Sequence, residues 1–202
     1  YEITTRLVGS EMCIRDSHQF GSRRVRKEFA VPSSKLHLAW RLPCSAHPDT
    51  PALSALSSIL GGGRSARFYE KFHDRLGLVY GIEVHSNQSE TDEGAFTISM
   101  DVDRAQRDKV RDLVLQELRN LAEEDFTEDL KRVCKQTRVS RLRRRSSASG
   151  MASEMGADWF GARNLNLSSE WQEAIERVTT EDLHRVCSTW LSSPNVTEVS
   201  LD

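Results

Sequence analysis

The sequence predicts an α+β fold, in which a mostly antiparallel sheet carries helices packed on one of its faces. Residues 94–103 alternate strictly from Phe96 onward, with apolar residues at even positions and polar residues at odd positions. This alternation is typical of a strand with one packed and one wet face. Amphipathic helical segments stand on either side of the predicted strands, so the packed face would be covered by helices in a two-layer domain.

Five segments are expected to form the sheet. Each alternates apolar and polar residues or is rich in β-branched and aromatic residues. In the second segment, one face carries Leu36, Leu38, Trp40 and Leu42. The segments are residues 25–31, which would form an edge strand, then 35–42, 79–85 and 94–103, and finally NVTEVSLD at the end of the chain.

Helices are expected between and after these strands. The first is capped by Asp49 or Thr50, has Pro51 in its first turn and ends at a run of three glycines. A second helix is expected at residues 65–75. The later helices are expected at residues 104–124, from Thr127 as N-cap to a serine-rich break at 146–149, at 151–162, and from Thr179, which forms a capping-box pair with Asp182.

The composition is that of an ordinary globular domain of 202 residues, with 38% hydrophobic residues, 29% charged residues and a net charge of −2. This charge gives no overall field that would attract nucleic acid or an anionic membrane. No run of about 18 apolar residues could span a bilayer. No signal peptide is visible, which leaves the compartment open. The four cysteines form no C-x-x-C pair, so we expect ordinary and mostly buried thiols.

The first residues differ in character from the rest of the chain. Residues 1–17 show neither strand alternation nor helical periodicity, and VGSEMCIRDS resembles a translated sequencing adaptor. We therefore interpret residues 1–17 as a non-native or disordered segment. We interpret the chain as a fragment whose true N-terminal part is missing. Residues 18–202 are expected to form a single domain, because no repeat and no linker divides them.

The glycine run in LGGGRSARF raises the question of a phosphate site. A P-loop requires G-x-x-x-x-G-K-[ST] between a strand and a helix, but here the run follows a helix and lacks the lysine. The third glycine of G-x-G-x-x-G is also missing. A helix C-cap followed by a tight turn explains the glycines better.

No complete catalytic constellation is present. None of the six histidines lies in H-E-x-x-H or H-x-x-E-H, the spacings that place two imidazoles on one helix face near a carboxylate. No G-x-S-x-G elbow occurs, and no cysteine has a histidine placed by a motif. The sequence therefore assigns no catalytic residue and no metal ligand to this chain.

A basic helix offers a possible nucleic-acid stripe. Residues 131–145 hold eight Lys and Arg residues and no acid, whereas residues 123–129 hold five acids. Phosphate contacts are one interpretation. The other interpretation is a solvated helix, acidic near its start and basic near its end, which the helix dipole favours. No aromatic residue interleaves with the arginines for base stacking. We favour the solvated helix and expect no nucleic-acid partner.

Several segments together resemble one peptidase family. HPDTPALSALSSILGGGRSARFYEKFHDRLGLVYGIEV contains a hPD.paL helix, an iLGGG.SsRL turn and a lRe..GLvY segment that leads into a strand. The strand at 94–103, the amphipathic helix after it and VTTEDLHRVCSTWL then follow in matching order. Over residues 18–202, the chain resembles the C-terminal, non-catalytic domain of the insulinase/pitrilysin metallopeptidases, a family that includes the mitochondrial processing peptidase.

The resemblance implies a domain of processing-peptidase type. In that family, pairs of similar α+β domains face one another and enclose a chamber, and one domain holds zinc on H-x-x-E-H with a more distant glutamate as third ligand. Zinc with its glutamate base activates the attacking water. The present domain type lacks the motif and forms the opposing wall around an extended peptide. The resemblance thus implies no cofactor in this chain and zinc in a homologous partner domain, either in cis or as a subunit.

The resemblance also implies substrate-binding positions. Tyr80 matches a family tyrosine that contacts the substrate near the scissile bond in some members, and an arginine often stands seven residues earlier, where this chain has His73. Histidine is shorter than arginine and mostly neutral at pH 7, so the transition-state contact is in doubt. Tyr80 can equally be a buried aromatic on a strand face shared with Ile82 and Val84. Gly61, Gly62 and Gly63 match the site of a substrate-sensing loop, although a plain turn is the alternative.

The functional hypothesis is a non-catalytic, substrate-enclosing domain of a zinc metalloendopeptidase. The alternative is a catalytically degenerate family member that acts as a scaffold or peptide-binding subunit. A zinc-binding domain encoded upstream would support the first, and its absence or erosion would support the second.

Overall fold

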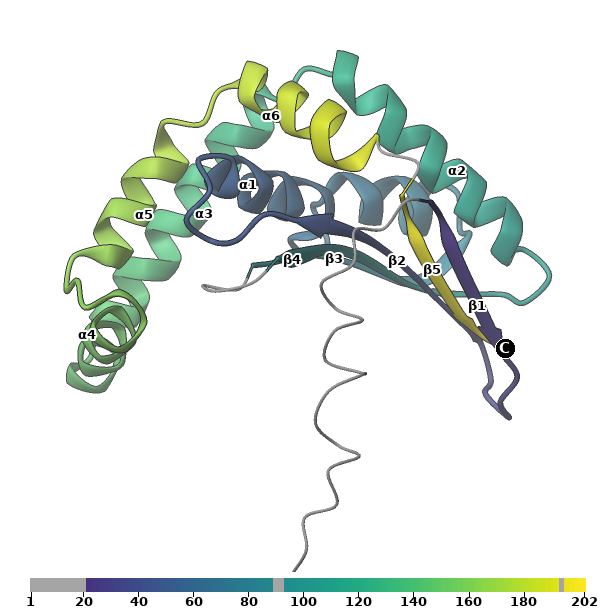
Figure 1. Ribbon diagram of the computed structural model, residues 1–202, viewed down its shortest axis with the longest axis horizontal. Coiled ribbons are helices and arrows are strands. Elements are labelled where there is room, and N and C mark those ends of the chain that lie inside the picture. Colours follow the sequence, from purple (N-terminus) through teal and green to yellow (C-terminus); the bar gives the residue numbers. More distant parts are fainter. Residues whose placement is uncertain (1–20, 89–92, 193–194) are drawn as a thin grey trace, which may run out of the picture.

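The computed structural model describes residues 21–88, 93–192 and 195–202. It has two layers, a five-stranded sheet and a set of helices over one of its faces (Figure 1). The predicted α+β class, with helices on one face of a mostly antiparallel sheet, is confirmed. The adaptor-like residues 1–17 lie outside the described part of the chain.

The sheet has the strand order β1-β5-β2-β4-β3. Neighbouring strands are antiparallel, except that β1 and β5 run parallel. The edge strand predicted at residues 25–31 is instead shorter and starts earlier, because its ladder with β5 ends at the pair Lys27 and Leu201. The strands are β1 (Arg23–Lys27), β2 (Ser34–Leu42), β3 (Val79–Asn87), β4 (Gly94–Val102) and β5 (Thr197–Leu201).

The core lies between the sheet and the helices. The predicted apolar face of β2 is confirmed, and its residues stand directly opposite the apolar residues of β4, for example Leu38 opposite Ile98 and Trp40 opposite Phe96. These four side chains are at most 2% exposed. Cross-strand apolar pairs of this kind stabilise a sheet and fix its register, since a slip of one residue would expose them all.

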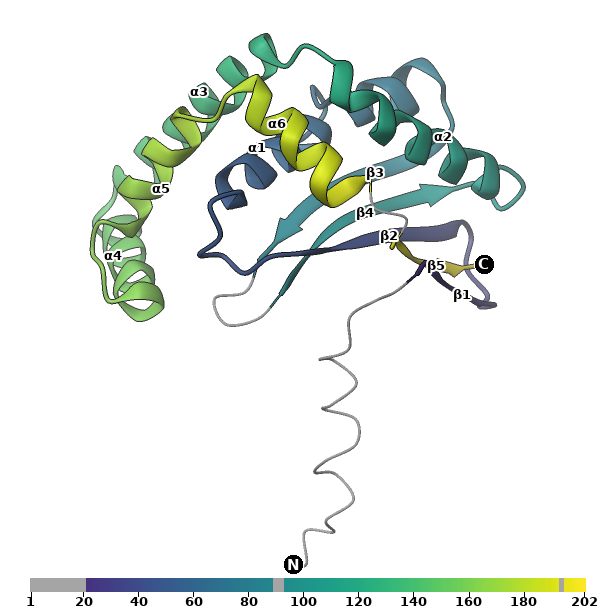
Figure 2. The same ribbon diagram turned by 45° about the horizontal axis from the view of Figure 1, so that its top comes forward.

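The helices fall into two groups. Helices α1, α2 and α6 lie over the sheet, whereas α3, α4 and α5 extend past its end as a helical arm (Figures 1 and 2). The α-helices are α1 (Thr50–Gly61), α2 (Arg107–Asn120), α3 (Thr127–Arg145), α4 (Ala148–Ala162), α5 (Leu167–Glu176) and α6 (Thr180–Val186). Shorter helical segments are η2 (Tyr69–Arg75), η3 (Leu121–Glu123) and η4 (Cys187–Leu191).

The helix starts differ partly from expectation. The capping box of α6 is confirmed, with Thr179 Oγ1 accepting from the Asp182 N–H at 3.2 Å and the Thr179 N–H donating to the Asp182 carboxylate at 3.0 Å. Thr127 is not the N-cap of α3. Its N–H and hydroxyl both donate to the carboxylate of Asp125, at 2.9 and 2.7 Å, so the chain has already turned at Phe126.

The N-cap of α1 is Asp49, but its side chain makes no cap hydrogen bond. The carboxylate instead accepts from Trp190 Nε1 at 2.9 Å and pairs with Arg185. It therefore joins the first helix to the last helical segment. Helix α5 was not predicted from the sequence, although Leu167, Trp171 and Ile175 follow one another at helical spacing.

Candidate functional site

The face of the sheet opposite the helices is not covered by any described element (Figure 1). Many of its side chains form hydrogen bonds. His37 Nδ1 lies 2.8 Å from Ser99 Oγ, and Lys35 Nζ lies 2.5 Å from Asp101 Oδ1. We call this surface the open face. It comprises Lys35, His37, Ala39 and Arg41 of β2, Thr97, Ser99 and Asp101 of β4, and Glu83 and His85 of β3.

Tyr80 belongs to the open face because of a β-bulge. The register of β3 against β4 shifts between Val79, which pairs with Val102, and Gly81, which pairs with Asp101. The extra residue places Tyr80 on the side of Asp101. Its side chain is 66% exposed, whereas Ile82 is buried. Of the two interpretations of Tyr80, the buried aromatic on a face shared with Ile82 and Val84 is therefore wrong.

His73 lies in the helical layer, on η2. Its ring stacks on Tyr69, with ring centroids 4.4 Å apart, and its Nδ1 is 2.7 Å from the carboxylate of Asp74. Its side chain is 30% exposed. No hydrogen bond or ring contact joins His73 to Tyr80 in the part of the chain that the structure describes. The two positions that the family resemblance pairs are thus not brought into contact within this domain.

The glycine run forms the turn that ends α1, on the helical side of β3. A Cβ on Gly61 would lie 2.5 Å from the backbone nitrogen of Val84, so any side chain there would collide with the strand. A Cβ on Gly62 would collide with the carbonyl oxygen of Ser58, and Gly63 has a φ of +105°, a conformation that favours glycine. This geometry favours the tight turn, and it places the run on the opposite face of β3 from Tyr80.

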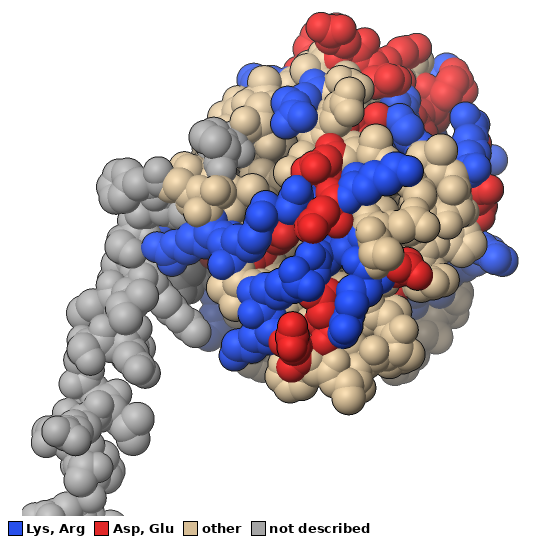
Figure 3. Space-filling view, turned by 90° about the vertical axis from the view of Figure 1, so that its right-hand side faces the viewer, with Lys and Arg blue, Asp and Glu red and all other residues tan. Residues whose placement is uncertain are grey.

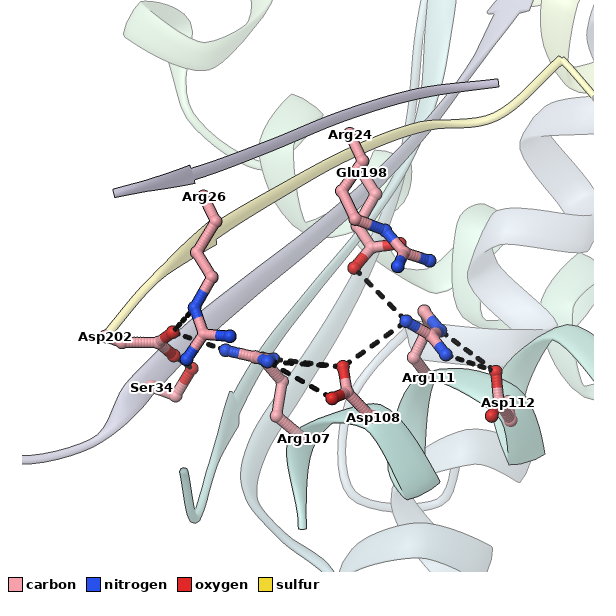
Figure 4. Close-up of polar contacts among 9 residues, drawn as sticks. All are labelled: Arg24, Arg26, Ser34, Arg107, Asp108, Arg111, Asp112, Glu198 and Asp202. Atoms are coloured by element: carbon pink, nitrogen blue, oxygen red, sulfur yellow. Dashed lines mark hydrogen bonds and ion pairs between the residues drawn. The ribbon is translucent and has the colours of Figure 1, made fainter. Parts of the chain in front are cut away.

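Charged side chains gather where β1, β5 and α2 meet. On this side of the molecule, rows of Lys and Arg alternate with Asp and Glu (Figure 3). At the centre is Asp202, which is 1% exposed. Ser34 Oγ donates to its carboxylate at 2.5 Å, Arg26 Nε lies 2.5 Å away, and the buried Arg107 forms a third pair (Figure 4).

The contacts of Asp202 favour its ionised form. The hydrogen bond from Ser34 is the largest cause, and Arg107 and Arg26 add to it, so that the pKa of Asp202 falls from 3.8 to about 2 although burial acts in the opposite sense. A second set lies beside it, in which Glu198 pairs with Arg24 at 2.9 Å and with Arg111 at 3.6 Å (Figure 4). We call the residues of both sets, with Asp108 and Asp112, the edge cluster. It fastens α2 to the sheet edge.

The basic stretch of residues 131–145 lies on α3. Half of its basic side chains pair with acids, namely Lys131 with Glu128, Arg132 with Asp129, and Arg141 and Arg145 with Glu154. Lys and Arg side chains that neutralise phosphates release counterions from a nucleic acid, and this release favours binding. A side chain that already pairs with an acid contributes less to this effect than an unpaired one. The pairs favour the interpretation as a solvated helix.

The described residues do not offer a zinc site. In residues 21–88, 93–192 and 195–202, no three His, Cys, Asp or Glu side chains come together as metal ligands. Cys44, Cys134 and Cys187 are free thiols, and burial raises the pKa of Cys187 to about 12. None of the helices in these ranges has the length and apolar character that crossing a membrane requires.

Comparison with known proteins gives one family. The family model of the peptidase M16 inactive domain matches residues 13–136. The match thus begins inside residues 1–17, the segment that resembles a translated sequencing adaptor. No curated protein matches the chain.

Several solved structures share the fold. A protease from Helicobacter pylori has a TM-score of 0.79 and 23% identity, over 91% of this chain and 45% of that one. A peptidase M16 inactive domain from Pseudomonas fluorescens has a TM-score of 0.77 and 20% identity, over 90% and 43%. An inactive peptidase domain from Bordetella parapertussis has a TM-score of 0.72 and 17% identity, over 86% and 92%. The chain therefore spans less than half the length of the first two.

Proposed function

Because the chain belongs to the peptidase M16 family, the insulinase/pitrilysin metallopeptidases, and matches the inactive domain of that family, we propose that it is the non-catalytic, substrate-enclosing domain of a zinc metalloendopeptidase. The zinc belongs to a homologous partner domain, in the same chain or in another subunit. When bound there, zinc activates the water that attacks the peptide bond. This chain supplies a wall that holds the peptide.

The observation that carries this proposal is the position of Tyr80. The bulge in β3 turns a large aromatic side chain out of the core and onto the open face. Exposed aromatic side chains of this kind are enriched at binding surfaces, because the ring gives apolar contact and the hydroxyl a hydrogen bond. Around it, the open face presents donors and acceptors, such as His37 and Ser99, that suit the backbone of an extended peptide.

His73 is the second proposed peptide contact. It lies in the last turn of η2, the helical segment that precedes β3, and its side chain is partly exposed. A histidine side chain is shorter than an arginine side chain and offers an oxyanion or a carbonyl fewer N–H donors than the guanidinium group does. We therefore expect His73→Arg to raise peptide turnover. The glycine turn is a structural element in this proposal, since close packing and backbone conformation account for its three glycines.

The proposal is tested by joining this chain to the zinc-bearing domain of its parent protein. The chain alone should bind no stoichiometric zinc and should not cleave an extended fluorogenic peptide, whereas the joined protein should cleave it. In the joined protein, Tyr80→Ala should lower kcat/KM about tenfold, because an aromatic contact is lost. The matched control is Phe160→Ala, which removes an 81% exposed aromatic on α4, outside the open face.

Each outcome is informative. Cleavage by the chain alone would refute a non-catalytic role. A joined protein that binds the peptide without cleaving it would favour the scaffold alternative. Equal kcat/KM for Tyr80→Ala and the unsubstituted protein would show that Tyr80 does not contact the peptide. An unchanged rate for His73→Arg would show the same for His73.

A further inference from the structure

Helix α4 buries its charged residues and exposes its apolar ones. Its buried residues are Glu154 and Asp158, which are also the only charged residues that it contains. A helix at the surface of a globular protein normally shows the reverse pattern, with an apolar stripe toward the core and charged residues toward water. The exposed side of α4 carries no charge, and its large side chains are Met151, Met155, Trp159 and Phe160.

The two carboxylates fix the orientation of the helix. Glu154 accepts from Arg141 on α3, at 3.0 and 3.2 Å. Asp158 accepts from the hydroxyl and the N–H of Ser168, at the start of α5, at 2.6 and 3.1 Å. A rotation of α4 that buried its apolar side would break both sets of hydrogen bonds. The packing of the arm therefore holds the apolar side outward.

We call Met151, Met155, Trp159 and Phe160 the outer face of α4. The first three follow one another at intervals of four residues and so form one line along the helix, and Phe160 is adjacent to Trp159. Each is between 41% and 81% exposed. The helix forms the outer end of the arm, beside α3 and α5 (Figures 1 and 2). An exposed apolar surface of this kind marks a site that contacts a protein or a membrane.

Only cations border the outer face. Between residues 135 and 165, every exposed charged residue is basic, because the two acids in this range are the buried Glu154 and Asp158. Three arginines, at positions 143–145, lie in the last turn of α3, just before α4. Arg163 follows α4, and its guanidinium carbon lies 5.4 Å from the centre of the Trp159 ring. The apolar surface thus has positive charge at both ends of the helix, which favours an anionic partner.

An anionic lipid surface fits both properties. Aromatic side chains enter the boundary between headgroups and acyl chains, and arginines beside them are attracted to the lipid phosphates. A nucleic acid would pair with the arginines but leave the outer face in water. A second copy of the chain would bring two cationic borders together, and like charges repel. The place of α4 at the end of the arm suits a flat lipid surface, which needs no groove.

We propose that α4 binds a membrane that contains anionic lipids. The helix lies in the plane of the interface, with its outer face toward the acyl chains and with Arg143, Arg144 and Arg163 at the headgroup phosphates. Its 15 residues span about 22 Å along that plane. The whole chain has a charge of −2, so the attraction comes from this local set of arginines. No residue of the outer face belongs to the open face, so the inference does not rest on the proposed function.

The experiment is co-sedimentation of this chain with lipid vesicles. One set of vesicles contains phosphatidylcholine with about 30% phosphatidylglycerol, and the other contains phosphatidylcholine alone. We expect binding to the anionic vesicles and binding that is at least about tenfold weaker to the neutral ones, because each arginine near the surface adds to the attraction. Raising the salt concentration to about 0.5 M should remove most of this difference, since salt screens exposed charges.

One pair of variants tests the apolar contribution. Trp159→Ala combined with Phe160→Ala should lower binding to both kinds of vesicle about tenfold, because less apolar surface enters the membrane. The matched control is Phe29→Ala combined with Leu76→Ala, which removes two exposed apolar side chains outside the arm and should leave binding unchanged. All four side chains are exposed, so the thermal unfolding of each variant should match that of the unsubstituted chain.

A second pair tests the charges. Arg143→Gln combined with Arg144→Gln should lower binding to the anionic vesicles about tenfold and should change binding to the neutral vesicles little. The control is Arg23→Gln combined with Arg104→Gln, two exposed arginines outside the arm, so that the net charge changes equally. Equal losses in the two double variants would show that the overall charge, and not the border of α4, governs binding.

Three further results would overturn the proposal. These are no binding to the anionic vesicles, equal binding to both kinds of vesicle at low salt, and equal binding of the unsubstituted chain and the variant without Trp159 and Phe160. A dimer in lipid-free solution that this variant dissociates would assign the outer face to a second copy instead. Vesicle binding by this chain that is lost in the joined protein would assign it to the partner domain. The cleavage assay contains no lipid, so failure here leaves the proposed function unaffected.

Discussion

Ser34 and Asp202 lie 168 residues apart in the chain, yet the Ser34 hydroxyl donates a 2.5 Å hydrogen bond to the Asp202 carboxylate. Both side chains are at most 2% exposed. The same carboxylate pairs with the buried Arg107 at the start of α2. One acidic group thus connects the beginning of β2, the end of β5 and a helix, which makes it the central residue of the edge cluster.

Asp202→Asn should therefore be strongly destabilising. The substitution leaves Arg107 without its buried charge partner and with only the exposed Asp108, and breaking a buried pair on one side costs about 3 kcal/mol or more. Chemical denaturation at neutral pH gives the free energy of unfolding. Asp108→Asn is the matched control, because it removes an exposed partner of the same arginine and should cost less than about 1 kcal/mol. Equal losses in the two variants would contradict the central role of Asp202.

The same carboxylate predicts acid sensitivity. The pKa of Asp202 is about 2 in the folded chain against an ordinary value of 3.8, so the folded state holds the ionised form more strongly. Its contribution to stability is present above the ordinary value and is lost as the pH falls through 3.8 toward 2. The difference in unfolding free energy between the unsubstituted chain and Asp202→Asn should shrink over that interval. A difference that stays constant with pH would show that another group is responsible.

The sequence predicted the core well because alternation is a local property, readable within β2 and β4. At Tyr80 it left an exposed and a buried position open, because one extra residue in a bulge reverses the face of every residue before it, and only Gly81 hinted at the irregularity. Helix α5 was missed because its apolar residues are sparse and lie within a polar stretch. The edge cluster could not be predicted, since its residues meet only after strands and a helix far apart in the chain have packed.

The glycines of the turn should respond differently from a glycine elsewhere. Gly61→Ala would force a Cβ against the Val84 backbone and should cost about 2 kcal/mol. Gly63→Ala should cost about 1 kcal/mol, because alanine is strained at a φ of +105°. Gly156→Ala, inside α4 with nothing within 4 Å of the added carbon, should instead stabilise the chain slightly. Thermal unfolding measures all three, and a neutral Gly61→Ala would show that the turn can open without loss.

The capping box of α6 predicts a smaller effect. Thr179→Ala removes the acceptor of the Asp182 N–H and should lower the free energy of unfolding by about 1 kcal/mol. Thr180→Ala changes the neighbouring residue, which makes no such bond in the described chain, and should be nearly neutral. Both substitutions remove a hydroxyl and a methyl group. The difference between their free energies of unfolding, measured by urea denaturation, therefore reports the hydrogen bond alone. Indistinguishable midpoints would mean that the cap contributes nothing.

Cys187 should be chemically inert while the chain is folded. The thiolate is the reactive form, and burial raises the pKa of this thiol to about 12, so at about pH 8 only about one molecule in ten thousand carries it. Alkylation with iodoacetamide, located by peptide mapping, should modify the half-buried Cys44 in the folded chain and Cys187 only after denaturation. The raised pKa also means that this thiol contributes stability below its ordinary value of 9.0, and that the contribution is lost as the pH rises toward 12. Similar rates at Cys44 and Cys187 without denaturant would show that the core between η4 and the sheet opens readily.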